Sequence, residues 1–284
     1  MNHEPAKDLL NRHSIVPLAH PPRLFTIDVD GTLLDRRHQV SDVSIDAIAH
    51  VRARGVEVLL ATSRGPQALK PILEVLSLLH PAVFVCSQGA ITGSYIGDKL
   101  NVLSRCPLPV QLARRVVRQA LVAGITVNWF SESAWLVNRV DATVETESRI
   151  VGSRPRVCNL LAQARGPDKL MLIVPEGRRD ELQLIAEALP SELTVQASNP
   201  GYLEITRADV DKGRAVEAYC QAMDIPARGV VAIGDGPNDL SLFDFAGLSI
   251  APANAHESVR NAATLNAPSN DDDGVAHTLY ALVP

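Results

Sequence analysis

The chain is short of cysteine and has no long apolar run, and both shortages exclude whole classes of protein. Its four cysteines form no C-x-x-C pair, which fits a reducing cytosol in which cysteines act as small buried hydrophobic residues. No apolar run reaches the roughly 20 residues that cross a bilayer. The N-terminus lacks the basic start and unbroken apolar stretch of a signal peptide. We therefore expect a cytoplasmic protein with no membrane partner.

The chain also lacks an excess of positive charge. Its 27 Lys and Arg residues are outnumbered by 32 Asp and Glu residues, for a net charge of −5, whereas non-specific nucleic-acid binding needs a basic surface. We therefore expect no nucleic-acid partner. The hydrophobic content of 46% and charged content of 21% are those of a globular protein. A length of 284 residues allows one large or two modest domains with ample core.

The order of the expected elements divides the chain. Apolar strands alternate with amphipathic helices over residues 23–88, and the same alternation returns over residues 211–263. Such βαβ units predict a doubly wound parallel sheet with helices on both faces. Between them, short strands come in neighbouring pairs, which is typical of antiparallel hairpins. The sequence therefore predicts an α/β protein in three parts. Residues 1–22 form an N-terminal extension, residues 23–90 and 201–284 form a core domain, and residues 91–200 form an inserted α+β domain.

Two acidic residues stand out in the stretch "LFTIDVDGTLLD". Asp28 and Asp30 are one residue apart at the end of an apolar strand, so their side chains project the same way. Burying carboxylates is unfavourable unless something pairs with them. A turn after the strand accounts for one of the two acids, and the presence of the second indicates that this place binds a ligand.

Three further stretches place polar groups at strand ends or helix starts. "LLATSRG" ends in Thr62 and Ser63 just before a helix that starts with proline, an arrangement suited to an anion. Lys212 begins a helix in "DVDKGRAV", and "VVAIGDGPNDLSL" ends a strand with Asp235, Asn238 and Asp239. In a doubly wound sheet, ligands gather at the carboxyl ends of the strands.

Together these groups predict phosphoryl transfer. Several carboxylates suit Mg²⁺, a hard cation that prefers oxygen ligands, and the cation would offset the mutual repulsion of the acids. Hydroxyl groups and a lysine suit phosphate oxygens. The combination is the chemistry of a carboxylate nucleophile attacking phosphorus.

The motifs "DVDGT", "TSR", the lysine of "DKG", and "GDGPND", in this order, resemble the four motifs of the haloacid dehalogenase superfamily. The insertion between the second and third motifs resembles the C2B cap of its Cof-like, type IIB branch. The resemblance implies a Rossmann-like core and a Mg²⁺-dependent phosphatase acting on small phosphorylated metabolites such as sugar phosphates. We expect such a protein to be a monomer or a homodimer.

The resemblance also implies roles for individual residues. Asp28 corresponds to the nucleophile that becomes an aspartyl-phosphate, and Asp30 to the general acid and base. The implied phosphate-binding residues are Thr62, Ser63, Lys212 and Asn238. The implied metal ligands are Asp28, Asp30 through its backbone carbonyl, Asp235 and Asp239.

The chain departs from the branch at three places that touch no catalytic group. Ser63 replaces a common glycine, Gln88 in "SQGA" replaces a usual asparagine, and "IAPANA" replaces the commoner "AMGNA". These departures bear on recognition of the leaving group. We also expect a hinge between core and cap near residues 88–93 and 198–202.

Two alternative functions stay open at this level. One is a phosphomutase that resembles phosphomannomutases, which share this core and cap type. Such an enzyme needs additional basic residues in the cap, for which Arg139, Arg149, Arg154 and Arg156 are available. A simple solvated surface also accounts for these arginines. A regulator that only binds a phosphometabolite would ordinarily have lost the nucleophile or the acid, and here Asp28 and Asp30 are both present.

Overall fold

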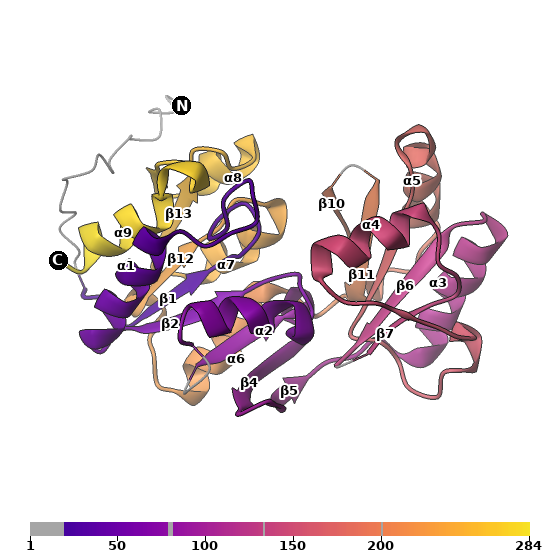
Figure 1. Ribbon diagram of the computed structural model, residues 1–284, viewed down its shortest axis with the longest axis horizontal. Coiled ribbons are helices and arrows are strands. Elements are labelled where there is room, and N and C mark those ends of the chain that lie inside the picture. The colour runs from indigo at the N-terminus through magenta and orange to yellow at the C-terminus, as the bar shows by residue number, and fades with distance from the viewer. Residues whose placement is uncertain (1–19, 79–81, 133, 200) are drawn as a thin grey trace.

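The chain folds around two separate β-sheets (Figure 1). This computed structural model describes residues 20–78, 82–132, 134–199 and 201–284. Most of the predicted N-terminal extension, residues 1–19, lies outside the described residues. The larger sheet belongs to the core, and the smaller sheet belongs to the inserted segment, called the cap below.

The core sheet has the strand order β14-β13-β12-β1-β2-β3-β4-β5. The strands from β14 through β3 run parallel, and β4 and β5 add an antiparallel edge. The strands are β1 (Leu24–Ile27), β2 (Glu57–Ala61), β3 (Val83–Cys86), β4 (Ile91–Ile96), β5 (Lys99–Arg105), β12 (Val230–Ile233), β13 (Leu248–Pro252) and β14 (Leu265–Ala267).

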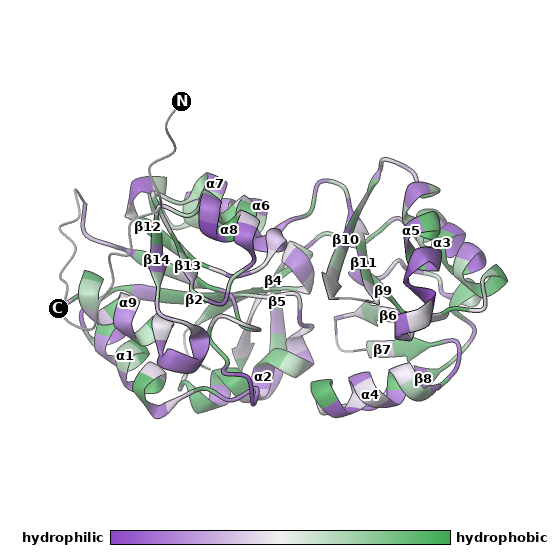
Figure 2. Cartoon of the chain, turned by 90° about the horizontal axis from the view of Figure 1, so that it is seen from above, coloured by the Kyte–Doolittle hydropathy of each residue, from purple (hydrophilic) through white to green (hydrophobic). Residues whose placement is uncertain are grey.

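Helices cover both faces of the core sheet, as Figure 2 shows from above. Successive residues of a strand point to opposite faces, so Leu24 packs in one apolar cluster and Phe25 in another. This arrangement confirms the predicted doubly wound α/β core. One face carries α1 (Asp42–Ala53), α2 (Pro66–Val75) and α9 (Gly274–Leu282), and the other carries α6 (Lys212–Ala222), α7 (Leu240–Phe245) and α8 (Glu257–Ala262).

The cap sheet has the order β10-β11-β9-β6-β7-β8 and is antiparallel except for the last pair. Its strands are β6 (Thr126–Ser131), β7 (Ala134–Val137), β8 (Arg156–Val157), β9 (Lys169–Ile173), β10 (Leu193–Asn199) and β11 (Tyr202–Arg207). Leu170, Leu172 and Ile205 pack on one face against α3 (Val110–Val122) and α5 (Arg179–Glu187). Lys169 and Glu204, each next to one of these residues in its strand, occupy the other face, which borders a cavity that core residues also line.

Helix boundaries follow the capping signals in the sequence. Ser41 caps α1, because its side chain accepts a hydrogen bond from the amide of Ser44. Helix α4 (Ala142–Val151) was not predicted, although Asp141 caps its start and Gly152 ends it in the left-handed conformation. No helix in the described part of the chain is both long and apolar enough to cross a membrane.

Both boundaries between core and cap lie further along the chain than the sequence predicted. Strands β4 and β5 fall within the predicted cap range 91–200 but belong to the core sheet, because β4 pairs with β3 and β5 pairs with β4. Strand β11, which falls within the predicted core range 201–284, pairs with β9 of the cap sheet. The chain therefore crosses from core to cap between β5 and α3 and returns between β11 and α6. The hinge predicted at 88–93 and 198–202 does not coincide with these crossings.

Candidate active site

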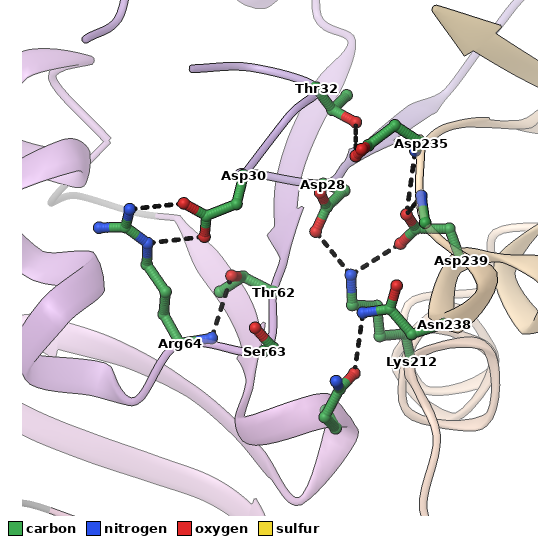
Figure 3. A network of polar contacts seen from close by, with 12 residues as sticks. Asp28, Asp30, Thr32, Thr62, Ser63, Arg64, Lys212, Asp235, Asn238 and Asp239 are labelled. Carbon is green, nitrogen blue, oxygen red and sulfur yellow. Dashed lines mark hydrogen bonds and ion pairs between the residues drawn. The ribbon is translucent and has the colours of Figure 1, made fainter. Parts of the chain in front are cut away.

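The centre of the site is an ion cluster at the carboxyl ends of β1 and β12. The amide of Asp28 continues the parallel pairing by donating to the carbonyl of Ile233 at 2.9 Å. Nζ of Lys212, the first residue of α6, donates to Oδ1 of Asp28 at 2.5 Å and to Oδ1 of Asp239 at 2.7 Å (Figure 3). All three side chains are buried, so the lysine supplies the positive charge that two desolvated carboxylates require.

The turn after β12 places Asp235 beside this cluster. Oδ2 of Asp239 accepts hydrogen bonds from the amides of Asp235 and Gly236, at 3.1 Å and 3.0 Å, which fixes the turn. The hydroxyl of Thr32 donates to Oδ1 of Asp235 at 2.8 Å. Gly31 has a φ of +82°, and a Cβ there would overlap the carboxylate of Asp235. The glycine of "DVDGT" therefore lets the two loops approach each other.

Crowding of these carboxylates changes their pKa values. Burial, followed by the charge of Asp239, raises the pKa of Asp28 well above its usual value, against the effect of Lys212. The same two causes raise the pKa of Asp235 to about 6. Burial lowers the pKa of Lys212, but Asp239 and Asp28 outweigh it and raise that pKa overall. The cluster thus holds its lysine charged while at least one carboxylate lacks a counter-charge.

The cluster fits a divalent cation. Asp28, Asp235 and Asp239 each offer a carboxylate oxygen, and these oxygens lie within 4.8 Å of one another. Both oxygens of Asp239 already accept hydrogen bonds from Lys212 and from the turn amides, so Asp28 and Asp235 are the side chains best placed to hold the ion. All are oxygen donors, as Mg²⁺ prefers. The carboxylate of Asp30, the fourth predicted ligand, is outside this cluster, and its predicted contribution through the backbone carbonyl stays a prediction.

The second predicted motif forms a tight turn between β2 and α2. Thr62 is fully buried, and its Oγ1 accepts a hydrogen bond from the amide of Arg64 at 3.1 Å. Helix α2 starts at Pro66 after Gly65, and no side chain caps its first amides. Ser63, Gly65 and Pro66 line the same cavity as Asp28. A turn followed by an uncapped helix start at the cavity wall suits a phosphate group.

Asp30 lies apart from the ion cluster. Its carboxylate accepts two hydrogen bonds from the guanidinium group of Arg64, at 2.8 Å and 2.6 Å (Figure 3). The Asp30 side chain is 40% exposed, whereas that of Asp28 is 7% exposed. Two acids only two positions apart therefore occupy different environments, one buried beside a lysine and one at the cavity wall beside an arginine.

The cavity between core and cap has a volume of about 570 Å³. The core contributes Asp28, Asp30, Ser63, Asp235 and Asn238 to its lining. The cap contributes the aromatic, acidic and basic side chains Phe130, Trp135, Glu147, Lys169, Tyr202 and Glu204, among others. Burial raises the pKa of Glu147, whose carboxylate accepts a 3.3 Å hydrogen bond from Tyr202. The cavity can hold a small molecule with its charged end against the core.

Of the predicted site residues, five line one cavity, and three are buried next to it: Asp28, Asp30, Ser63, Asp235 and Asn238 in the lining, and Thr62, Lys212 and Asp239 behind it. The structure also adds residues that the sequence did not indicate. Arg64 has no predicted role, although it follows Ser63 directly. Lys169 and Glu204 carried no signal, because each is a single charge in a strand of the cap. Only their position on the cavity face of the cap sheet reveals them.

Comparison with known proteins agrees with this geometry. The family of haloacid dehalogenase-like hydrolases matches residues 25–279. The chain belongs to this family. This confirms the resemblance drawn from the four motifs and the prediction of an enzyme of the phosphatase type.

Individual similar proteins match nearly the whole chain. The pyridoxal phosphate phosphatase YbhA of Escherichia coli is 25% identical over 270 residues, which are 91% of this chain and 98% of that protein. The crystal structure of TM0651 from Thermotoga maritima is 27% identical, with a TM-score of 0.79, and covers 91% of this chain and 97% of that one. A haloacid dehalogenase-like hydrolase from Bacteroides thetaiotaomicron, 22% identical, shares the fold with a TM-score of 0.82 over 91% of this chain and 98% of that chain.

Proposed function

We propose that the protein is a Mg²⁺-dependent phosphatase that hydrolyses small phosphorylated metabolites through an aspartyl-phosphate at Asp28. The observation that carries the proposal is the buried contact of Asp28 with Lys212 beside the uncompensated carboxylate of Asp235. A nucleophilic carboxylate must be ionised, and its position beside a lysine and a cation site favours that form.

In the first step, an oxygen of Asp28 forms a bond to phosphorus while the bond between phosphorus and the leaving oxygen breaks. Asp30 gives its proton to that leaving oxygen. In this proposal, Thr62, the amide of Ser63, Lys212 and Asn238 bind the phosphate oxygens. Preorganised donors of this kind stabilise charge that develops in the transition state.

In the second step, a water molecule attacks the aspartyl-phosphate and gives a proton to Asp30. The bond between Asp28 and phosphorus breaks, so that inorganic phosphate leaves and both acids return to their starting forms. Mg²⁺ held by Asp28 and Asp235 would supply positive charge that screens the nucleophile from the phosphate.

The cap side of the cavity favours a phosphatase over a phosphomutase. None of Arg139, Arg149, Arg154 and Arg156 is among the described residues that line the cavity. Arg139 instead donates to Oγ1 of Thr126 and to the carbonyl of Gly124. The only cap cation among the described lining residues is Lys169, which pairs with Glu204. A second phosphate group would therefore meet more negative than positive charge in the cap.

A substrate panel tests the proposal. Hexose phosphates, triose phosphates, pyridoxal phosphate and flavin mononucleotide would be offered with Mg²⁺ and with excess chelator, and phosphate release would be measured. We expect release from at least one ester with Mg²⁺ only, and none from the Asp28→Asn variant. Full turnover in chelator with no residual metal would contradict the metal requirement. A cytoplasmic location, in keeping with free Cys86, Cys106, Cys158 and Cys220, and a monomeric or homodimeric state are part of the same proposal.

A further inference from the structure

Three consecutive carbonyl groups of the phosphate-binding turn, residues 62–64, are held by hydrogen bonds. The amides of Gln88 and Ser87 donate to the carbonyls of Thr62 and Arg64, at 3.2 Å and 2.8 Å. The carbonyl between them, that of Ser63, accepts from Nζ of Lys169 at 2.8 Å. The core thus holds the two outer carbonyls, and a lysine of the cap holds the middle one.

Lys169 is a buried cation with few partners. Its side chain is 6% exposed, and besides the Ser63 carbonyl it contacts Oε2 of Glu204 at 3.1 Å. Its Nζ also lies 5.3 Å from the ring centroid of Phe130. A buried ammonium group is stable only while its hydrogen bonds are made. Movement of the cap away from the core would separate Lys169 from Ser63.

Glu204 extends the contact to the fourth motif. Its Oε2 accepts a hydrogen bond from Nε2 of Gln88 at 2.9 Å, and Oε1 of Gln88 accepts one from Nδ2 of Asn238 at 3.1 Å. Gln88 and Glu204 are both buried. One chain of polar contacts therefore runs from Ser63 through two cap residues and Gln88 to Asn238.

We propose that Lys169, Glu204 and Gln88, called the cap–core bridge, orient the phosphate-binding turn and Asn238 when the cap lies over the core. They are positioning residues, since they act on the substrate through Ser63 and Asn238. The inference rests on the proposed function. It also gives a role to Gln88, which stands where the related branch usually has asparagine. A glutamine spans the distance from Asn238 to Glu204, which the shorter asparagine cannot span in the same way.

The physical reason lies in the planar peptide between Ser63 and Arg64. Its carbonyl is held by Lys169 and its amide by Oγ1 of Thr62, so its plane is fixed at both ends. Among the hydrogen bonds of the described residues, the amide of Ser63 donates none, which leaves it available to a phosphate oxygen. The amide of Ser63 belongs to the preceding peptide, whose carbonyl accepts from the amide of Gln88, and the two peptide planes meet at the Cα of Ser63. Loss of the bridge would free the second plane and so loosen the turn around the amide of Ser63. Phosphate affinity is therefore coupled to cap closure.

The first test is Gln88→Asn, which keeps the amide group but shortens the side chain by one methylene. Gln88 has a φ of 61°, a conformation that asparagine tolerates well, so the variant should fold. We expect KM for the best ester and the inhibition constant of inorganic phosphate to rise about tenfold, as for one lost hydrogen bond to a charged group. General damage to the fold would instead lower kcat at unchanged KM.

A second variant removes the contact to Ser63. Lys169→Met combined with Glu204→Gln avoids leaving an unpaired buried charge. We expect at least the same tenfold loss of phosphate affinity as for one lost charged hydrogen bond. Because both variants act through one chain of contacts, combining them should cost less than the product of their separate effects. Lys70→Met is the matched control, since Lys70 pairs with Asp98 on the core surface, and it should leave the kinetics unchanged.

Hydrogen exchange provides a readout that needs no turnover. Both bridge variants should speed amide exchange in peptides covering residues 62–65 and 87–88, and Lys70→Met should not. If no ester is hydrolysed, the proposed function is wrong. Amide exchange and phosphate binding measured by calorimetry would still test whether the cap–core bridge orients the turn. Unchanged exchange, or a fall in kcat with unchanged phosphate affinity, would overturn the proposal.

Discussion

Lys212 and Asp28 are 184 positions apart in the chain, yet Nζ of Lys212 lies 2.5 Å from Oδ1 of Asp28. The contact exists because β1 and β12 are neighbours in the core sheet and α6 starts at their carboxyl ends. It joins the first and third motifs of the sequence in one buried ion cluster. The predictions that follow depend on this cluster and on the acid beside it.

Asp28→Asn should abolish turnover, because an amide oxygen is a poor nucleophile and cannot form the aspartyl-phosphate. Rapid acid quench of the wild-type protein during turnover, followed by mass spectrometry, should find phosphate on Asp28. The label should be absent from the variant. Appreciable activity of Asp28→Asn, or label on Asp30 instead, would require the roles to be reversed or dropped.

Asp30→Asn should slow both chemical steps while leaving the nucleophile in place. General acid–base catalysis typically contributes about 10²–10⁴-fold, so the loss for an alkyl phosphate should fall in that range. An activated aryl phosphate, whose leaving group needs no proton, should recover part of the first step. The phosphoprotein should then accumulate in the variant. Equal losses for alkyl and aryl esters would argue against Asp30 as the acid.

Arg64→Ala should reduce kcat by about tenfold or more, because it removes two charge-assisted hydrogen bonds that hold Asp30. In an Asp30→Asn background the same substitution should cost much less, since the group that it positions is already disabled. Steady-state kinetics of the two single variants and the double variant measure this coupling. Fully additive losses would show that Arg64 acts on something other than Asp30.

Asp235 should make metal-free stability depend on pH. Burial and Asp239 raise its pKa from 3.8 to about 6, so the folded protein holds this proton more tightly than the unfolded chain does. The resulting stability is fully present below about pH 4 and is lost as pH rises through about 6. In chelator, this contribution to the free energy of unfolding should fall by up to about 3 kcal/mol by pH 7.

Urea unfolding of the wild type and of Asp235→Asn at pH 5 and pH 7.5 isolates that contribution. The variant should lose stability less steeply with pH than the wild type does. Added Mg²⁺ should stabilise the wild type at pH 7.5 and do so weakly in the variant, because binding to the folded state alone favours it. A wild type that grows more stable with pH relative to the variant would contradict the assignment.

Local signals in the sequence determined the core fold and most of the site. The alternation of apolar strands and helices predicted the parallel sheet, because strands buried on both faces must be apolar throughout. The sequence also indicated four motif residues, because polar groups at the end of a buried strand or the start of a helix are typical of a ligand site: Asp28, Thr62, Lys212 and Asp235. Helix α4 was missed even though Asp141 and Gly152 mark its ends.

Only the tertiary structure decided what depends on pairing between distant segments. Strands β4 and β5 were predicted as a hairpin of the cap. They belong to the core sheet because β4 pairs with β3, and this pairing leaves no pattern in the sequence. The partners of Arg64 and Lys169 were equally hidden, since a single charged residue does not reveal its counter-ion. The sequence by itself determined the chemical groups of the site, and the packing of cap on core determined which of them meet.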